Sequence, residues 1–60
     1  MAKLFLYQLT KGQKFRIMYG NELLPEVLTF DRIDGFYSIC FDTDKQIAHI
    51  AAYAEVRVVP

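Results

Sequence analysis

Hydrophobic and polar residues alternate along most of this chain with the two-residue period of β-strands. The pattern predicts strands over residues 3–9, 14–19, 27–33, 36–41, 47–50 and 55–59. No segment keeps a helical period over a useful length, and the six predicted strands are separated by short polar turns. The chain is therefore expected to be all-β.

The strongest local signal is the Asp34-Gly35 dipeptide between two β-rich runs, which is typical of a two-residue type I′ hairpin turn. Such a turn would place Ile33 opposite Phe36 and Arg32 opposite Tyr37. Continued along both strands, this register predicts an apolar inner face made of Leu28, Phe30, Ile39 and Phe41. The outer face would then carry Thr29, Asp31, Ser38 and Cys40.

Polar residues, proline and segment length predict the turns and loops in the rest of the chain. Residues 10–13 and 42–46 are polar turns, and residues 20–26 form a loop because Pro25 cannot sit in a central strand. Residues 51–54 are too few for a helix and predict a single 3₁₀ turn before the last strand. The expected core comprises Ile17, Leu28, Phe30, Ile39, Phe41, Ile50, Val56 and Val58, with Leu4 or Leu6 covering one end.

This order of short strands, with a tight central hairpin and a turn before the last strand, resembles the SH3-like small β-barrels. The segment Ile50-Ala51-Ala52-Tyr53-Ala54-Glu55-Val56 is similar to the end of many such barrels. Lys11-Gly12 followed by Phe15-Arg16-Ile17 is similar to the start of their first strand. The resemblance implies one domain over residues 1–60, an SH3-like barrel of five to six short strands with one 3₁₀ turn before the last strand. The chain has no tryptophan and no Ala-Leu-Tyr-Asp-Tyr run, so it lacks the pattern of a proline-peptide groove.

The composition is unusually hydrophobic for so short a chain. The chain has 60 residues, of which 53% are hydrophobic, and a chain of this length buries only about 60% of its unfolded surface. Surplus apolar surface, with exposed edges expected at residues 3–9 and 55–59, favours a homo-oligomer, either a dimer or a small ring.

The chemistry-bearing residues are few. The single cysteine, Cys40, excludes an internal disulfide and suits a reducing, cytoplasmic setting. We interpret Cys40 as a structural thiol and His49 as a solvated strand residue. Because these two are the only soft metal ligands and no nucleophile–base set is recognisable, we expect no metal, no cofactor and no enzyme. The apolar start of the chain stops at Gln8, too early for a signal peptide, and no run is long enough for a membrane helix.

Seven basic residues balance seven acidic ones. We therefore expect a protein-interaction module of the adaptor or inhibitor type, such as a phage or small bacterial accessory protein. It would bind a larger partner through the hairpin tip, at Arg32, Ile33, Phe36 and Tyr37, with a cation–π contact between Arg32 and Tyr37. The alternative is a nucleic-acid-binding barrel of the Sm-like or KOW-like type, although the glycine and asparagine signature of Sm-like rings is absent. Its candidate contacts are Lys11, Lys14, Arg16, Tyr19 and Tyr53.

Overall fold

The structure is a computed structural model that describes residues 3–60, and over this range it is all-β, as predicted. The strands are β1 (Leu4–Phe5), β2 (Lys14–Tyr19), β3 (Glu22–Leu23), β4 (Leu28–Asp34), β5 (Tyr37–Phe41), β6 (Ile47–Ala51) and β7 (Glu55–Val58). The 3₁₀ helix η1 (Leu6–Gln8) follows β1. Within residues 3–60 this three-residue turn is the longest helical segment, so no helix there could cross a membrane.

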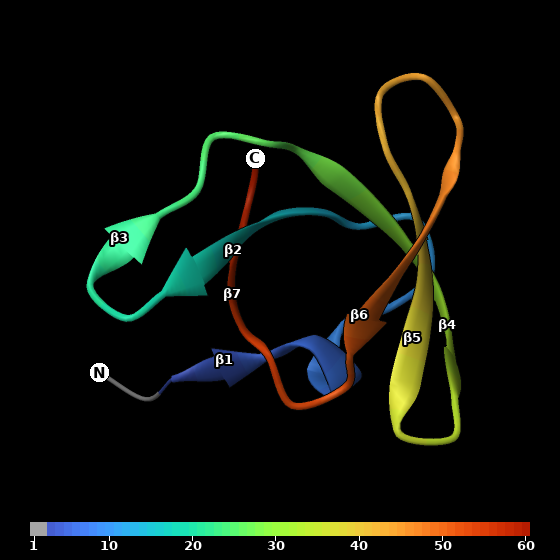
Figure 1. The fold of residues 1–60 in the computed structure, drawn as a ribbon, viewed down its shortest axis with the longest axis horizontal. Helices are drawn as coiled ribbons and strands as arrows, with labels where there is room; N and C mark the ends of the chain where they lie inside the picture. Colours follow the sequence, from blue (N-terminus) through green and yellow to red (C-terminus); the bar gives the residue numbers. More distant parts are fainter. Residues whose placement is uncertain (1–2) are drawn as a thin grey trace.

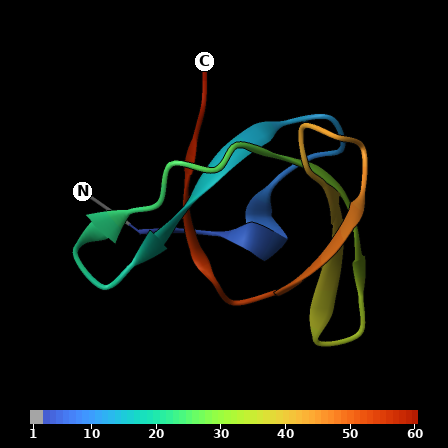
Figure 2. The same ribbon diagram turned by 45° about the horizontal axis from the view of Figure 1, so that its top comes forward.

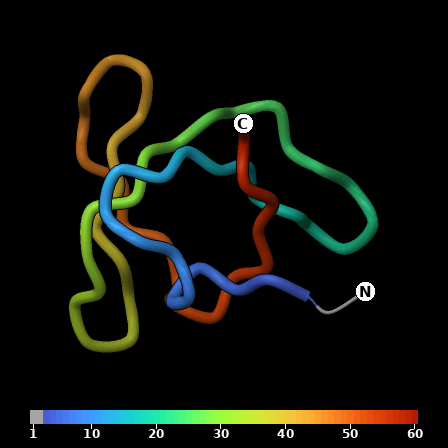
Figure 3. The backbone as a smooth tube through the Cα atoms, turned by 180° about the vertical axis from the view of Figure 1, so that it is seen from behind, coloured from blue at the N-terminus to red at the C-terminus, as the bar shows by residue number. Residues whose placement is uncertain are grey.

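The strands form an antiparallel sheet in the order β1-β7-β2-β4-β5-β6, with β3 paired to β2. The last strand therefore returns to lie beside the first long strand, and the chain curls into a ring (Figures 1 and 2). Seen from behind, the β4–β5 tip and the β5–β6 loop project from opposite ends of the β4–β6 sheet (Figure 3). The prediction that residues 55–59 form an exposed edge is wrong, because β7 is paired on both sides.

The central hairpin forms, but its turn lies one residue later than predicted. Asp34 pairs with Tyr37, so the turn residues are Gly35 and Phe36. Gly35 has φ +65°, whereas neither Asp34 nor Phe36 has a positive φ. A type I′ turn on Asp34-Gly35 would need positive φ at both residues, whereas glycine at the first central position suits a type II′ turn. The shifted turn thus avoids placing Asp34 in the left-handed region.

This shift reverses the faces of β5. Between Phe30 and Arg32 the pairing changes register at Asp31, and beyond this bulge Phe30 lies opposite Cys40. Because a one-residue slip moves a whole strand's side chains to the other face, Ser38 and Cys40 point into the core. Ile39 and Phe41, which were predicted to be core residues, lie half-buried on the outer face.

The core also differs in what fills its end. Phe15, Leu6 and Val56 are completely buried, and Ile17, Ile50 and Leu4 pack against this cluster. The remaining buried hydrophobic residues are Leu9, Leu28, Phe30, Cys40 and Ala52. Val58 was predicted to be in the core but is 41% exposed. Residues 6–9 do not continue as a strand, because η1 turns Leu6 and Leu9 inward, into the core cluster.

Two further elements differ in place. The 3₁₀ turn is η1 rather than a turn before the last strand, and residues 51–54 form a simple turn in which the Ala54 N–H donates to the Ala51 carbonyl at 3.0 Å. The predicted loop over residues 20–26 contains β3, and just after this strand the Arg16 Nε donates to the Leu24 carbonyl at 2.8 Å.

Candidate interaction surface

The four residues predicted to bind a partner all lie at or beside the β4–β5 tip. Phe36 occupies the turn and is 79% exposed, the highest value among the large hydrophobic side chains. Tyr37, Ile33 and Arg32 are also exposed. Ile33 lies opposite Ser38, and Tyr37 lies opposite Asp34, so Ile33 and Tyr37 point to opposite faces of the hairpin.

The predicted cation–π pair between Arg32 and Tyr37 is wrong. Arg32 lies opposite Ile39 in the observed register, and its guanidinium pairs with the neighbouring Asp31 carboxylate. The Asp31 carboxylate also forms an ion pair with the Lys11 ammonium, with the nitrogen and oxygen 3.6 Å apart. The bulge therefore gathers both cations around one carboxylate and leaves Tyr37 without a cationic partner at this tip.

The exposed tip is fixed to the body of the protein by backbone hydrogen bonds. The Ala52 N–H donates to the Phe36 carbonyl at 2.9 Å, and the Tyr7 N–H donates to the Ala52 carbonyl at 3.0 Å. Phe36, the turn before β7 and η1 are thereby joined in a chain. Phe36 is presented on an anchored turn rather than on a free loop.

Beside this anchor lies a row of three aromatic rings. The rings of Phe5 and Tyr7 are nearly parallel, with centroids 6.1 Å apart. Tyr7 meets Tyr53 edge to face, with centroids 5.3 Å apart, and both tyrosines are exposed. Such geometries are the favoured ones for aromatic pairs. We call Phe5, Tyr7, Tyr53 and the adjacent Phe36 the aromatic end of the molecule.

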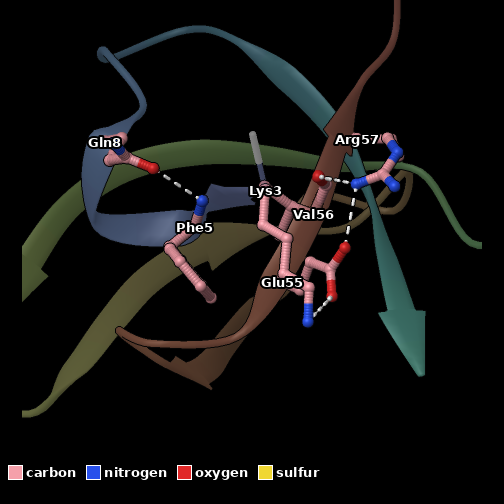
Figure 4. A network of polar contacts seen from close by, with 6 residues as sticks. All are labelled: Lys3, Phe5, Gln8, Glu55, Val56 and Arg57. Atoms are coloured by element: carbon pink, nitrogen blue, oxygen red, sulfur yellow. Dashed lines mark hydrogen bonds and ion pairs between the residues drawn. The ribbon is translucent and has the colours of Figure 1, made fainter. Parts of the chain in front are cut away.

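Several polar contacts lie around the β1–β7 pairing, next to Phe5 (Figure 4). The Gln8 side-chain oxygen accepts the Phe5 N–H at 2.8 Å, which closes η1 around Tyr7. On the neighbouring strand, Glu55 accepts from Arg57 at 3.1 Å and lies 4.0 Å from the Lys3 ammonium. The start of η1 is joined to the turn before β7 by backbone hydrogen bonds, in which the Leu6 N–H donates to the Ala54 carbonyl at 2.9 Å. The alternating sequence pattern gave no sign that Phe5 would join the two tyrosines.

A groove of about 580 Å³ lies at the β5–β6 loop, on the outer side of the sheet. The groove is lined by two lysines, one aspartate and four uncharged residues, namely Lys14, Lys45, Asp42, Val27, Thr29, Phe41 and Thr43. Lys14, Thr29 and Phe41 are cross-strand neighbours on β2, β4 and β5, which explains why they share one face. Within residues 3–60, neither lysine forms an ion pair.

The alternative nucleic-acid contacts are not gathered on one surface. Lys11 pairs with Asp31, and Arg16 is turned onto the carbonyls of residues 23 and 24. Tyr19 belongs to the β2–β3 hairpin, whereas Tyr53 lies in the turn before β7. Lys14 alone among them lines the groove.

The reactive side chains are separated from one another. Burial raises the pKa of the Cys40 thiol, and the side-chain hydrogen bond between Cys40 and Ser38 opposes this only in part. His49 is exposed on β6. Among the described residues, no group of three metal-ligating side chains is close enough to hold an ion.

No family model, curated protein or solved structure matches the chain.

Proposed function

We propose that this protein is a small SH3-like barrel that binds a larger protein through its aromatic end and the adjoining hairpin tip. The observation that carries this proposal is the combination of exposure and anchoring at Phe36. The Phe36 side chain is 79% exposed, yet the Phe36 carbonyl accepts a hydrogen bond from the Ala52 N–H. The Ala52 carbonyl in turn accepts from the Tyr7 N–H, in the aromatic row.

Exposed aromatic residues on a rigid support suit protein recognition. Aromatic side chains and arginine are enriched where interfaces carry most of their binding energy. An anchored turn loses little conformational entropy on binding, which favours affinity. Phe36, Tyr53 and Tyr7 offer three such side chains on adjoining segments, with Arg32 and Tyr37 at the margin.

The SH3-like assignment is supported by the strand order. The meander β2-β4-β5-β6 is followed by a short turn, after which β7 returns to β2. This is the course that the resemblance in sequence implied, with β1 and η1 added at the N-terminal side. The fold by itself does not specify a partner.

The proposal is tested by affinity capture from the source cell's lysate, with and without nuclease. We expect one protein partner that survives nuclease, is lost with Phe36→Ala and is weakened by Tyr53→Ala. Tyr19→Ala is a matched control, since Tyr19 and Tyr53 are each 69% exposed. Tyr19 belongs to the β2–β3 hairpin, whereas Tyr53 lies in the turn before β7. Equal loss in the Tyr19 and Tyr53 variants, or binding indifferent to Phe36, would move the site elsewhere.

The second candidate remains nucleic-acid binding, and the observation in its favour is the groove with Lys14 and Lys45. Phosphate contacts make affinity fall steeply with salt, whereas a contact made by aromatic side chains responds weakly. Nuclease-sensitive capture that also weakens with salt and with Lys14→Gln would favour this candidate over the first.

A further inference from the structure

Strand β6 is an open edge of the sheet. It is paired to β5 on one side and ends the strand order on the other, as Figure 1 shows for the two neighbouring arrows. The opposite edge, β1, has only two residues before η1 begins. Of the two edges, β6 is therefore the one with a strand's length of backbone to offer.

The register shows which backbone groups of β6 point outward. The Asp42 N–H donates to the Gln46 carbonyl at 3.0 Å, and the Ala52 N–H donates to the Phe36 carbonyl at 2.9 Å. Both pairs continue the β5–β6 register. Bonded and unbonded pairs alternate in an antiparallel ladder, so Ala48 and Ile50 direct their backbone groups toward β5.

It follows that Ile47, His49 and Ala51 direct their N–H and C=O groups away from β5. The Ala51 carbonyl accepts the Ala54 N–H. Within residues 3–60, the N–H groups of all three residues and the carbonyls of Ile47 and His49 have no protein partner. This is a donor and acceptor row of the kind that another strand can extend.

The edge also lacks the features that keep such strands apart. Natural edge strands are protected by charged residues, proline or bulges, and β6 contains no charged residue, no proline and an unbroken register. Ile47, at its start, is 62% exposed.

We propose that β6 pairs with β6 of a second copy of this chain, antiparallel, about a two-fold axis that passes at His49. Residues whose backbone groups point outward must face each other in the new ladder, so only every second register is allowed. Among those registers, the one centred on His49 is the one that pairs all five residues of β6. It places Ile47 opposite Ala51 and Ala48 opposite Ile50 of the other copy.

This register is complementary both in bonding and in size. The two copies of His49 exchange both backbone bonds, and each Ala51 N–H donates to the Ile47 carbonyl of the other copy. On both faces an isoleucine meets an alanine, and the two copies of His49 face each other at the axis. A self-complementary edge of this kind specifies a second copy, because each strand supplies what its equivalent lacks.

The pairing is tested by sedimentation of three variants over a range of concentrations. Wild type and His49→Gln are expected to reach twice the 7.0 kDa mass of one chain. His49→Lys would bring two positive charges together at the axis and is expected to stay monomeric, with an unchanged circular dichroism spectrum. His49→Pro is also expected to stay monomeric. The N–H that proline lacks points away from β5, so the β5–β6 ladder stays intact.

Hydrogen exchange followed by NMR tests the register itself. The amides of His49 and Ala51 are expected to gain protection as concentration rises, whereas those of Ala48 and Ile50 are protected at every concentration. A monomer at all concentrations, or a dimer whose His49 amide stays unprotected, would overturn the proposal. The result is independent of the aromatic end, because Phe36→Ala is expected to leave this dimer intact.

Discussion

The hydroxyl oxygen of Ser38 lies 3.3 Å from the sulfur of Cys40, and both side chains are completely buried. The same hydroxyl donates to the Ile50 carbonyl at 2.8 Å. A small polar pair thus lies inside the core, where the Ser38 hydroxyl joins β5 to β6. Because a buried polar group must keep its hydrogen bonds, this pair constrains how the two strands pack.

Ser38→Ala is expected to lower the free energy of unfolding by about 1 kcal/mol, since it removes the hydroxyl's hydrogen bond to the Ile50 carbonyl and its contact with the Cys40 sulfur. The loss would be measured by urea denaturation. Thr43→Ala, at an exposed position in the β5–β6 loop, is the control and should change stability by less than about 0.5 kcal/mol. No difference between the two variants would show that Ser38 is not buried as described.

Cys40 is expected to make stability depend on pH in the alkaline range. Burial raises its pKa in the folded protein, while the unfolded thiol titrates at about 8.5. The folded state then binds the thiol proton more tightly, so this contribution is full below the unfolded pKa and is lost as pH rises through the folded pKa. The measurement is the urea midpoint from pH 7 to 10 for wild type and Cys40→Ala, and only wild type should show the added decline. Parallel pH curves for the two proteins would contradict this.

The sequence predicted where strands lie better than how they pair. Lys14–Tyr19 and the start of β6 were found at the predicted residues, because alternation identifies strands locally. The faces of β5 could not be found this way, since Ile39 and Phe41 look more like core residues than Ser38 and Cys40 do. The choice depended on which residue takes the positive φ at the turn.

The inner space around β5 also depends on distant residues. Leu6 and Leu9 reach it from η1, and the small side chains of Ser38 and Cys40 fit beside them in a core that larger residues fill elsewhere. The aromatic row needed the same long-range information, because Tyr7 and Tyr53 are far apart in the chain and meet only after β7 returns. Exposure at Phe36 was simpler to anticipate, since a residue at a hairpin turn has few neighbours.

The observed register makes two phenylalanines on neighbouring strands unequal. Phe30→Ala is expected to cost about 3–5 kcal/mol, enough to unfold a domain of this size, because Phe30 is buried in the core cluster. Phe41→Ala should cost about 1–2 kcal/mol, because that side chain is half-buried on the outer face. Thermal unfolding of both variants distinguishes the observed register from the type I′ register, in which the two losses would be similar.

The turn itself gives the last test, at Gly35. Its φ of +65° lies in the left-handed region, where a side chain costs roughly 1–2 kcal/mol. There is open space around the position, so Gly35→Ala is expected to lose stability through the backbone and not through a clash. Phe36→Ala, one residue later and largely exposed, should stay within about 0.5 kcal/mol of wild type in the same urea titration. If Phe36→Ala were instead the more damaging change, the ring would be packed in the free protein and could not serve as the exposed anchor of a partner site.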